Sequence, residues 1–439
     1  MATRFLPRAV SVKLRSILLL PLCLLLAAQF ARSYSVLSHE EIVDLVWQIQ
    51  IEPLLRHRFP TATDDDLRKA HAFAYGGSLV ADMGYYPFGN KYFSDLLHYV
   101  RSGDLTTQLL RDAKETNDLN DYAFALGALS HYAADNSGHP TINRVVAIEF
   151  PKLERKYGPQ VTYVDDPKAH IRTEFGFDMV QVAKNRYTSD RYHDFIGFEI
   201  DKPLLERAFQ ETYGMPLSDV IKNEDLAIGT FRRAVSQAIP EMTRVALLAR
   251  RKEIVQDTPN FNEKKFLYYV SRKQYEKDWG TDYRRPGFGA RVLSFFLKII
   301  PKVGPFSAVA FKIPTTQTED MYIKSIDLTI DDYRGLLRQS SAPHMVLVNK
   351  DFDTGRDTRA GEYKLTDETY QRLLSAQANH HFENTSPELR DNLLAFYSDL
   401  NAPIYTKRSK KTWKLTLTQL DQLRHTPPPP QKTASLWQP

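Results

Sequence analysis

The stretch SHYAADNSGH, residues 130–139, decides how the rest of this chain is interpreted. It places His131, Asp135 and His139 four residues apart, in an H-x3-D-x3-H pattern. Side chains at positions i and i+4 lie on one face of an α-helix, so the first two are close enough to share a metal ion. A single such pair is usually a solvated surface pair, but the triple favours a metal site.

The helix that carries this pattern is predicted to span Asp121 to Asp135. Ser137-Gly138 and the following Pro140 are stop signals, so we expect the helix to end there. His139 then lies just past the helix end, where the turn lets it fold back or reach a neighbouring ion.

A second pair with the same spacing is His170 and Glu174. Asp166-Pro167 precedes it and is typical of a helix start, with Asp as the cap and Pro in the first turn. We therefore expect a helix that presents both side chains on one face.

Further candidate donors lie upstream. Ser38 and Glu41 form a capping-box pattern, which puts His39 in the first turn of a helix. Asp82 is the last residue of the glycine-containing stretch 76–82. His98 lies on an amphipathic helix predicted over residues 92–100. Taken alone, each histidine is more simply an ordinary helix residue.

The first 33 residues have the pattern of a secretory signal peptide. A basic head is followed by an apolar run from Ile17 to Ala28, and Ala31 and Ser33 are small residues at the positions that a signal peptidase reads. An uncleaved membrane anchor is the alternative interpretation, but the apolar run is too short to span a bilayer stably. We therefore expect a secreted or periplasmic protein.

Removal of this segment changes the composition of the chain. Five of the 58 Lys and Arg residues leave with it and no acidic residue does, so 53 basic residues face 53 acidic ones. The one cysteine, Cys23, leaves too. Disulfides, thiolate metal sites and thiol nucleophiles are then excluded, and zinc has to be held by His, Asp and Glu.

As a set, these residues resemble the zinc-dependent phospholipase C family. The family includes bacterial phospholipases C, the zinc domain of glycosylphosphatidylinositol-specific phospholipase D and fungal single-strand nucleases, and residues 130–139 look most like the phospholipase D member. The resemblance covers roughly residues 34–251 and implies an all-α, phospholipase C/single-strand nuclease-type helical domain. The residues that carry it are His39, Asp82, His98, His131, Asp135, His139, His170 and Glu174.

The resemblance also implies a ligand at the mature amino terminus. In such enzymes the free amine and carbonyl of the first residue bind zinc, usually five residues before the first histidine. Five residues before His39 is Tyr34, where the signal-peptide pattern independently places the cut. Bacterial phospholipases and the nucleases begin with Trp instead, but the ligating atoms belong to the backbone.

Three zinc ions follow from the resemblance. Asp82, His98 and His131 would hold the first, Tyr34 and His39 the second, with Asp135 bridging the two. His139, His170 and Glu174 would hold a third. Asp82 and Asp135 are the candidate catalytic carboxylates. A hydroxide held between two cations is available near neutral pH, because the metals depress the pKa of water.

The domains expected from the sequence follow its composition. Phe261 to Lys312 has 11 basic and four acidic residues and contains an apolar run, and a proline run begins at Pro427. The organisation is a signal peptide (1–33), a phospholipase C-like domain (34–255), a basic, partly apolar connecting segment (256–319), a mainly helical C-terminal region (320–422) and a Pro-rich disordered tail (423–439).

Two weaker patterns lie in the second half of the chain. Arg284, Arg285 and Lys298 border apolar residues that would suit peripheral membrane contact, although a buried helix is the alternative. Asp351–Asp357 is similar to a calcium loop, but Arg356 replaces the required glycine, so a carboxylate-stabilised turn is favoured.

The function predicted from these features is hydrolysis of phospholipids or other phosphodiesters by a secreted zinc enzyme of phospholipase C type. A nuclease or nucleotidase on the same metal core is an alternative. The neutral mature chain argues against it, because nucleic-acid binders usually have a basic surface, and no specific nucleic acid is expected. A non-catalytic, zinc-stabilised binding protein is the third possibility, which the complete ligand set disfavours.

Overall fold

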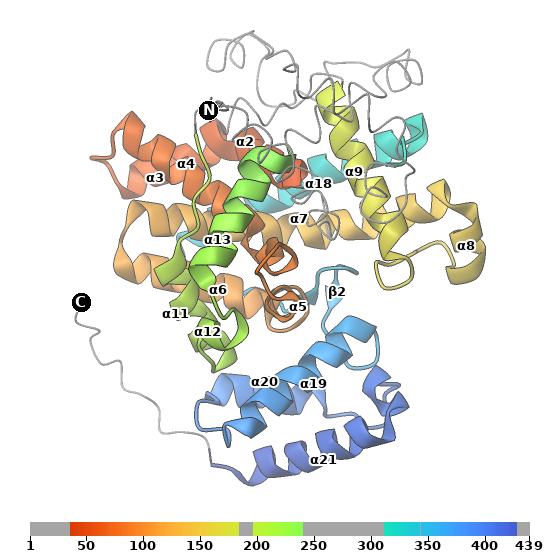
Figure 1. The fold of residues 1–439 in the computed structure, drawn as a ribbon. Helices are drawn as coiled ribbons and strands as arrows, with labels where there is room; N and C mark the ends of the chain where they lie inside the picture. The colour runs from red at the N-terminus through yellow and green to blue at the C-terminus, as the bar shows by residue number, and fades with distance from the viewer. Residues whose placement is uncertain (1–35, 184–195, 240–310, 343, 428–439) are drawn as a thin grey trace, which may run out of the picture.

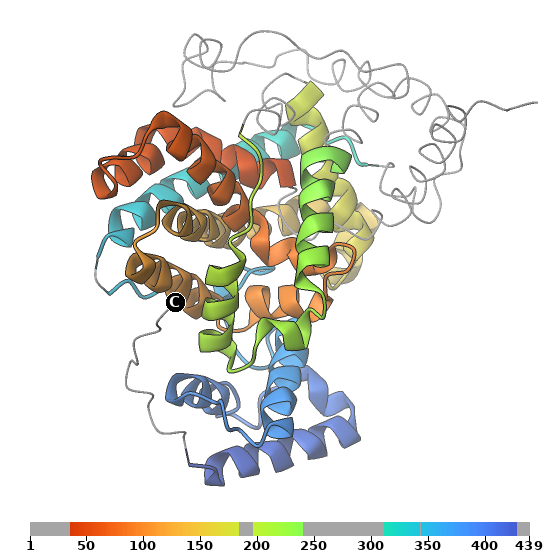
Figure 2. The ribbon, with the colours of Figure 1, turned by 60° about the vertical axis from the view of Figure 1, so that its left-hand side comes forward.

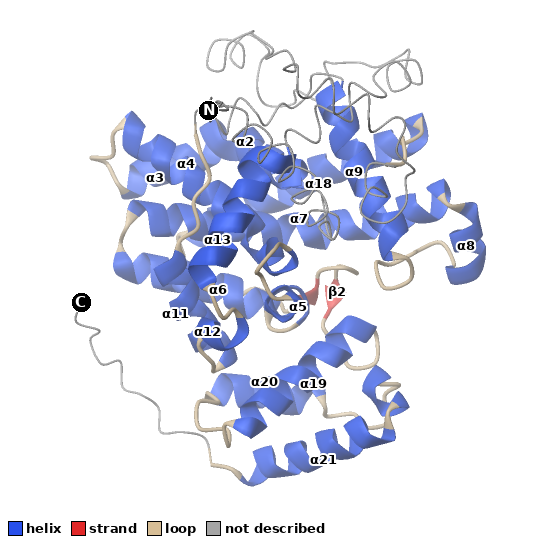
Figure 3. Ribbon diagram, viewed as in Figure 1, coloured by secondary structure: helices blue, strands red, loops and turns tan. Residues whose placement is uncertain are grey.

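A computed structural model describes residues 36–183, 196–239, 311–342 and 344–427. Within these ranges the chain forms helices and connecting loops, with one short hairpin (Figure 1, Figure 3). The predicted all-α class is confirmed. The signal segment, Tyr34, residues 261–310 and the end of the tail lie outside the described residues. No helix in the described part is both long and apolar enough to cross a bilayer.

The elements fall into three successive parts of the chain. The first comprises α2 (Val36–Val46), η1 (Trp47–Ile51), α3 (Glu52–Arg58), α4 (Asp64–Leu79), η2 (Val80–Tyr85), α5 (Lys91–Tyr99), α6 (Ser102–Thr116), α7 (Leu119–Glu149), α8 (Pro151–Tyr157) and α9 (Pro167–Ala183). The second comprises α11 (Lys202–Tyr213), α12 (Leu217–Val220), α13 (Glu224–Arg233) and η3 (Ala234–Ala238). The third comprises α18 (Thr316–Ser340), β1 (Lys350–Asp351), β2 (Arg356–Asp357), α19 (Lys364–Asn379), α20 (Pro387–Phe396), η5 (Tyr405–Arg408) and α21 (Lys410–His425).

Helix α7 is the centre of the molecule. Its 31 residues give it a length of about 46 Å, and α2, α4, α6, α9 and α18 pack around it (Figure 1). Its first turn is capped by Asp118, whose side chain accepts hydrogen bonds from the backbone N–H groups of Asn120 and Asp121. Residues 122–135 are buried along its whole circumference, as expected for a helix inside a core.

The predicted end of this helix at Ser137-Gly138 is wrong. The helix continues to Glu149, so His139 lies inside it, one turn after Asp135, rather than in a following turn. The three candidate ligands of the H-x3-D-x3-H pattern therefore share one continuous helical face.

Tertiary contacts hold the helix together across Pro140. Proline lacks an N–H group, so the carbonyl of Asn136 loses its helical donor there. Ser137 Oγ nevertheless donates to Asp332 Oδ2 of α18 at 2.5 Å. Gly355 also packs against α7, so closely that a Cβ added to this glycine would lie 2.6 Å from the backbone oxygen of Asn136. These contacts offset the local stop signals, of which Pro140 is the largest at about 3 kcal/mol.

The starts of the shorter helices were predicted with mixed success. Asp166 caps α9 as predicted, because its Oδ1 accepts the Ala169 N–H at 2.9 Å. Helix α5 agrees with the helix predicted over residues 92–100, and Asn90 caps it. The capping box at Ser38 is wrong, because α2 already includes that residue and its hydroxyl lies 2.6 Å from the hydroxyl of Tyr322.

The helices of the third part of the chain lie in two separate regions of the molecule. Helix α18 packs against α7 and α2, inside the main helical body. Helices α19, α20 and α21 form a separate layer below that body in Figures 1 and 2, centred on Tyr370 and Phe396, whose rings stack 3.6 Å apart. Both ends of this region extend a few residues past the predicted boundaries at 320 and 422. Helix α18 begins earlier because Thr315 caps it, and α21 ends later because Leu423 is buried.

Candidate metal centre

The structure brings five of the predicted ligands into two overlapping groups. His39, His131 and Asp135 form one group, and Asp82, His98 and His131 form the other. Within each group the ligand atoms lie within 4.8 Å of one another, and all five residues are buried. They come from α2, η2, α5 and α7, so four segments far apart in the sequence meet here.

Asp135 lies at the centre of these groups. Its Oδ1 is 3.5 Å from His39 Nε2, while its Oδ2 is 3.1 Å from His131 Nε2 and 3.6 Å from His98 Nε2. His139 Nε2 lies 3.8 Å from the same Oδ2. A carboxylate whose two oxygens face different imidazoles has the arrangement needed to bridge two cations.

The hydrogen bonds of His98 and His131 fix the tautomers of their rings. His98 Nδ1 lies 2.8 Å from the carbonyl oxygen of Ser94, and His131 Nδ1 lies 2.8 Å from that of Ser78. A carbonyl only accepts, so each Nδ1 donates and each neutral ring keeps its lone pair on Nε2. Both Nε2 atoms are buried and form no hydrogen bond with the described residues. Metal-binding histidines are oriented in this way, so the residues fit a metal ion.

The electrostatics of the centre favour positive charge near the two carboxylates. Burial opposes a charged His131, but Asp135 outweighs it and raises the pKa of His131 to about 9. Burial likewise opposes a charged His98, and Asp82 raises its pKa above the ordinary value. Burial and the neighbouring His131 lower the pKa of His39 to about 3. A divalent cation would supply this positive charge in place of the protons.

The remaining candidates are less closely assembled. His170 Nδ1 lies 3.3 Å from Glu174 Oε1 on α9, and His170 Nε2 donates to the Val161 carbonyl at 2.6 Å. Glu174 Oε2 and both nitrogens of His139 are buried without a hydrogen bond to the described residues. In the described ranges, however, these three side chains do not form a group with all ligand atoms within 4.8 Å.

Residues that the sequence did not single out hold the first helix in place. Asp178 of α9 accepts hydrogen bonds from the Leu37 N–H at 3.4 Å and from Ser38 Oγ at 3.2 Å. Tyr322 of α18 contacts the same serine hydroxyl. These bonds fix the turn that carries His39. They connect residues about 140 and 280 positions apart, so no local motif reports them.

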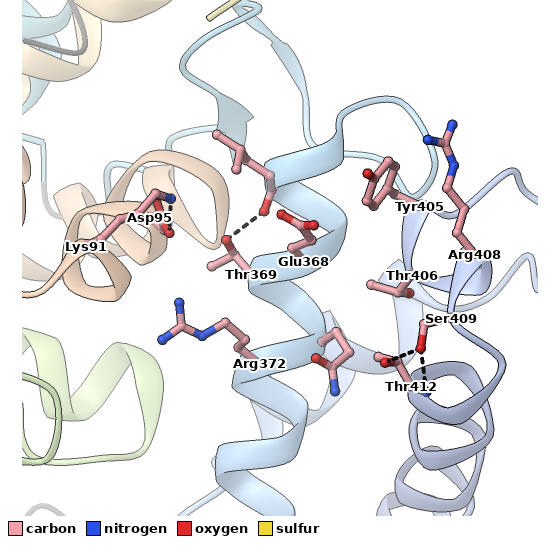
Figure 4. A pocket seen from close by; sticks show the side chains of 12 residues that line it. Lys91, Asp95, Glu368, Thr369, Arg372, Tyr405, Thr406, Arg408, Ser409 and Thr412 are labelled. Carbon is pink, nitrogen blue, oxygen red and sulfur yellow. Dashed lines mark hydrogen bonds and ion pairs between the residues drawn. The ribbon is translucent and has the colours of Figure 1, made fainter. Parts of the chain in front are cut away.

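A separate cavity of about 490 Å³ lies between α5 and the helices α19 and α21 (Figure 4). Its walls carry both signs of charge: Lys91 pairs with Asp95 at 2.5 Å, and Glu368, Arg372 and Arg408 also line it. None of the candidate metal ligands lines it. This cavity is therefore separate from the buried His/Asp cluster, which is the candidate metal centre.

Comparison with known proteins agrees with this geometry. The family described as zinc dependent phospholipase C matches residues 38–223, a range that contains His39, Glu174 and the six candidate side chains between them. No curated protein and no solved structure matches the chain. The segment from residue 38 to residue 223, with its all-α fold and its buried cluster of His and Asp side chains, therefore belongs to the zinc-dependent phospholipase C family.

Proposed function

We propose that this chain is a secreted, trinuclear-zinc phosphodiesterase that hydrolyses phospholipids or related phosphodiesters. The observation that carries the proposal is the pair of buried ligand groups that share His131 inside a zinc-dependent phospholipase C domain. Asp135 lies between the two groups, with one oxygen 3.5 Å from His39 Nε2 and the other 3.1 Å from His131 Nε2, so its carboxylate could bridge two ions close enough to act on one phosphate.

The residues divide the work as follows. His98, His131 and Asp82 would hold the first ion, and His39 with the amine and carbonyl of Tyr34 would hold the second, with Asp135 as the bridging carboxylate. When bound, zinc lowers the pKa of water so that hydroxide is available near neutral pH, and it offsets the charge of the phosphate. Asp82 Oδ1 is buried and lies 3.4 Å from His98 Nε2, and this carboxylate would be the proton acceptor for a water bound at the site.

His139, His170 and Glu174 are the proposed ligands of the third ion. The i, i+4 geometry of His170 and Glu174 and the unsatisfied nitrogens of His139 support this assignment. An ion held by these side chains would give partners to the buried atoms of His139 and Glu174 that form no hydrogen bond with the described residues.

Phospholipid is the proposed substrate class rather than nucleic acid. The mature chain is formally neutral, whereas nucleic-acid binders usually have a basic surface. Export through the signal segment would bring the enzyme to external lipids. We further propose peripheral membrane contact through Arg284, Arg285 and Lys298, which lie outside the described residues.

A hydrolysis panel on the mature protein tests the proposal. It compares phospholipid vesicles, glycosylphosphatidylinositol, single-stranded DNA and RNA, and a chromogenic phosphodiester, each with and without a chelator. We expect chelator-sensitive cleavage of lipid, with about three zinc ions per chain by elemental analysis. Preferential cleavage of DNA or RNA would favour a nuclease, and a protein without zinc would refute the proposal.

A matched pair of histidine variants links activity to the cluster. His98→Ala should lose zinc and activity. His71→Ala is the control, because His71 is equally buried but bonds to Asp44 at 2.9 Å, outside both ligand groups. If both variants keep the same zinc content, the cluster is not the metal site.

A further inference from the structure

A hairpin outside the family-matched range lies directly against the metal centre. Strands β1 and β2 pair antiparallel, with Lys350 opposite Asp357 and Asp351 opposite Arg356, and they lie beside α5 in Figure 3. Residues 348–355, which we call the clamp segment, include the hairpin turn. They follow the last matched residue by more than 120 positions.

The clamp segment holds the helix that carries His98. The N–H of Phe352 donates to the His98 carbonyl at 3.1 Å, and the ring of Phe352 lies 5.7 Å from the imidazole at an angle of 71°. The next residue along α5, Tyr99, donates its hydroxyl to Asp353 Oδ2 at 2.9 Å. Backbone and side chain of α5 are therefore fixed at the position of a candidate ligand.

The same segment contacts α7 beside His131. The ring of Phe352 lies 5.8 Å from that imidazole and 5.7 Å from the ring of Tyr132. The hydroxyl of Tyr132 donates to the Val348 carbonyl at 2.9 Å. One phenylalanine thus touches the imidazoles of both His98 and His131.

Two more contacts follow along the next turns of α7. An added Cβ on Gly355 would lie 2.6 Å from the Asn136 oxygen, so only a glycine fits there. Asn143 Nδ2 donates to the Asp353 carbonyl at 2.8 Å. The clamp segment therefore follows the stretch of α7 that carries His131, Asp135 and His139.

Internal hydrogen bonds make the turn rigid. Asp351 Oδ1 accepts the Thr354 N–H at 3.1 Å, and Asp353 Oδ2 accepts the hydroxyl of Tyr363 at 2.5 Å. The predicted carboxylate-stabilised turn is confirmed. Phe352 is only 2% exposed, so its ring is enclosed by this turn and by the two imidazoles.

From these contacts we infer that the clamp segment completes the metal centre and that Phe352 is a positioning residue for His98 and His131. The inference rests on the proposed function only in taking zinc as the ion bound there. The Nδ1 hydrogen bonds to Ser94 and Ser78 restrain one edge of each imidazole, and the Phe352 ring restrains the faces and edges beside it. Without that ring, both imidazoles gain freedom and the pre-formed geometry of the ligand atoms is lost.

The zinc affinity of Phe352 variants tests this inference. Phe352→Ala should weaken zinc binding by about 10- to 100-fold, measured by competition with a chromogenic chelator, because supporting residues of metal sites contribute to affinity on this scale. Phe352→Leu keeps an apolar side chain of similar bulk and should recover most of the affinity. A Tyr132→Phe variant, which removes the hydrogen bond to the Val348 carbonyl and keeps the ring, should show a smaller loss.

The control is Phe396→Ala. Phe396 is also buried in the C-terminal part of the chain, but it stacks on Tyr370 and does not contact the histidines. It should lower the melting temperature while the zinc dissociation constant stays as in the wild type. If Phe352→Ala behaves like this control, or if it is unfolded and Tyr132→Phe binds zinc as tightly as the wild type does, the clamp inference is wrong. Absence of zinc from the wild type would instead refute the proposed function.

Discussion

Substitution of Gly127 by Ala should disturb the metal centre through the packing of two helices. Gly127 lies on α7 where it crosses α4, and a Cβ added there would be 2.0 Å from the Ala74 oxygen and 2.9 Å from the Ser78 nitrogen. The approach is mutual, since a Cβ on Gly77 of α4 would be 1.9 Å from the Phe124 oxygen. The two backbones are in direct contact, so no side chain is present to move aside.

The size of the effect follows from this geometry. Ordinary van der Waals contact for a Cβ begins at 3.4 Å, so the helices have to separate by about 1.4 Å at the crossing. Overpacking of this kind costs about 1–3 kcal/mol, which exceeds the 0.8–1.0 kcal/mol or so that alanine gains over glycine from helix propensity. Separation also stretches the 2.8 Å hydrogen bond from His131 Nδ1 to the Ser78 carbonyl. We therefore expect Gly127→Ala to bind zinc about 10-fold more weakly or worse.

The assay compares Gly127→Ala with Gly229→Ala in urea denaturation and in chelator competition. Gly229 is exposed on α13, and an added Cβ there would have no atom within 4 Å. The control variant should be unchanged or slightly more stable, by up to about 1 kcal/mol, with normal zinc affinity. Equal denaturation midpoints and equal zinc affinities in the two variants would refute the reasoning.

Three other perturbations give separate checks. Asp135→Asn should lose more than one zinc ion by elemental analysis, because its carboxylate is proposed to serve two ions; loss of one ion or none contradicts the bridge. An extra residue before Tyr34 should reduce zinc content and activity, and undiminished activity would show that the terminal amine is not a ligand. Burial, followed by the charge of Glu211, raises the pKa of Asp112 to about 7, so the stability it contributes is full below about pH 4 and is lost as pH rises through about 7. The free energy of unfolding of the wild type and of Asp112→Asn is measured by denaturation at each pH, and the decline between about pH 4 and about pH 7 should be smaller in the variant. The same pH slope in both proteins would count against the raised pKa.

The parts of the fold that the sequence predicted correctly are those set by local spacing. His131 with Asp135 and His170 with Glu174 lie on shared helical faces, because four residues complete about one turn. The cap at Asp166 was predicted for the same reason, since its donor is only three residues away. Such interactions depend on a few neighbouring residues, and these are visible in the sequence.

The errors occur where distant segments override local signals. Ser137, Gly138 and Pro140 form a strong local stop, yet α7 continues through them because Asp332 and Gly355 contact it from elsewhere in the chain. Likewise Ser38 has the sequence context of a helix cap, but its hydroxyl binds Asp178 and Tyr322. Local propensity amounts to about 1 kcal/mol or less for most residues and about 3 kcal/mol for a proline inside a helix, so the combined tertiary contacts can reverse it.

The role of Phe352 was also not predicted from the sequence, and the physical reason is a different one. Metal ligands are restricted to a few residue types, so His and Asp at helical spacing indicate a chemistry. A residue that supports those ligands has only to match the shape of the space beside them, and most buried aromatics look alike in a sequence. Phe352 contacts His98 and His131, so a segment outside residues 38–223 forms part of the surroundings of the centre. A chain cut to the family-matched region would keep all eight candidate side chains and still lack one wall of the site they form.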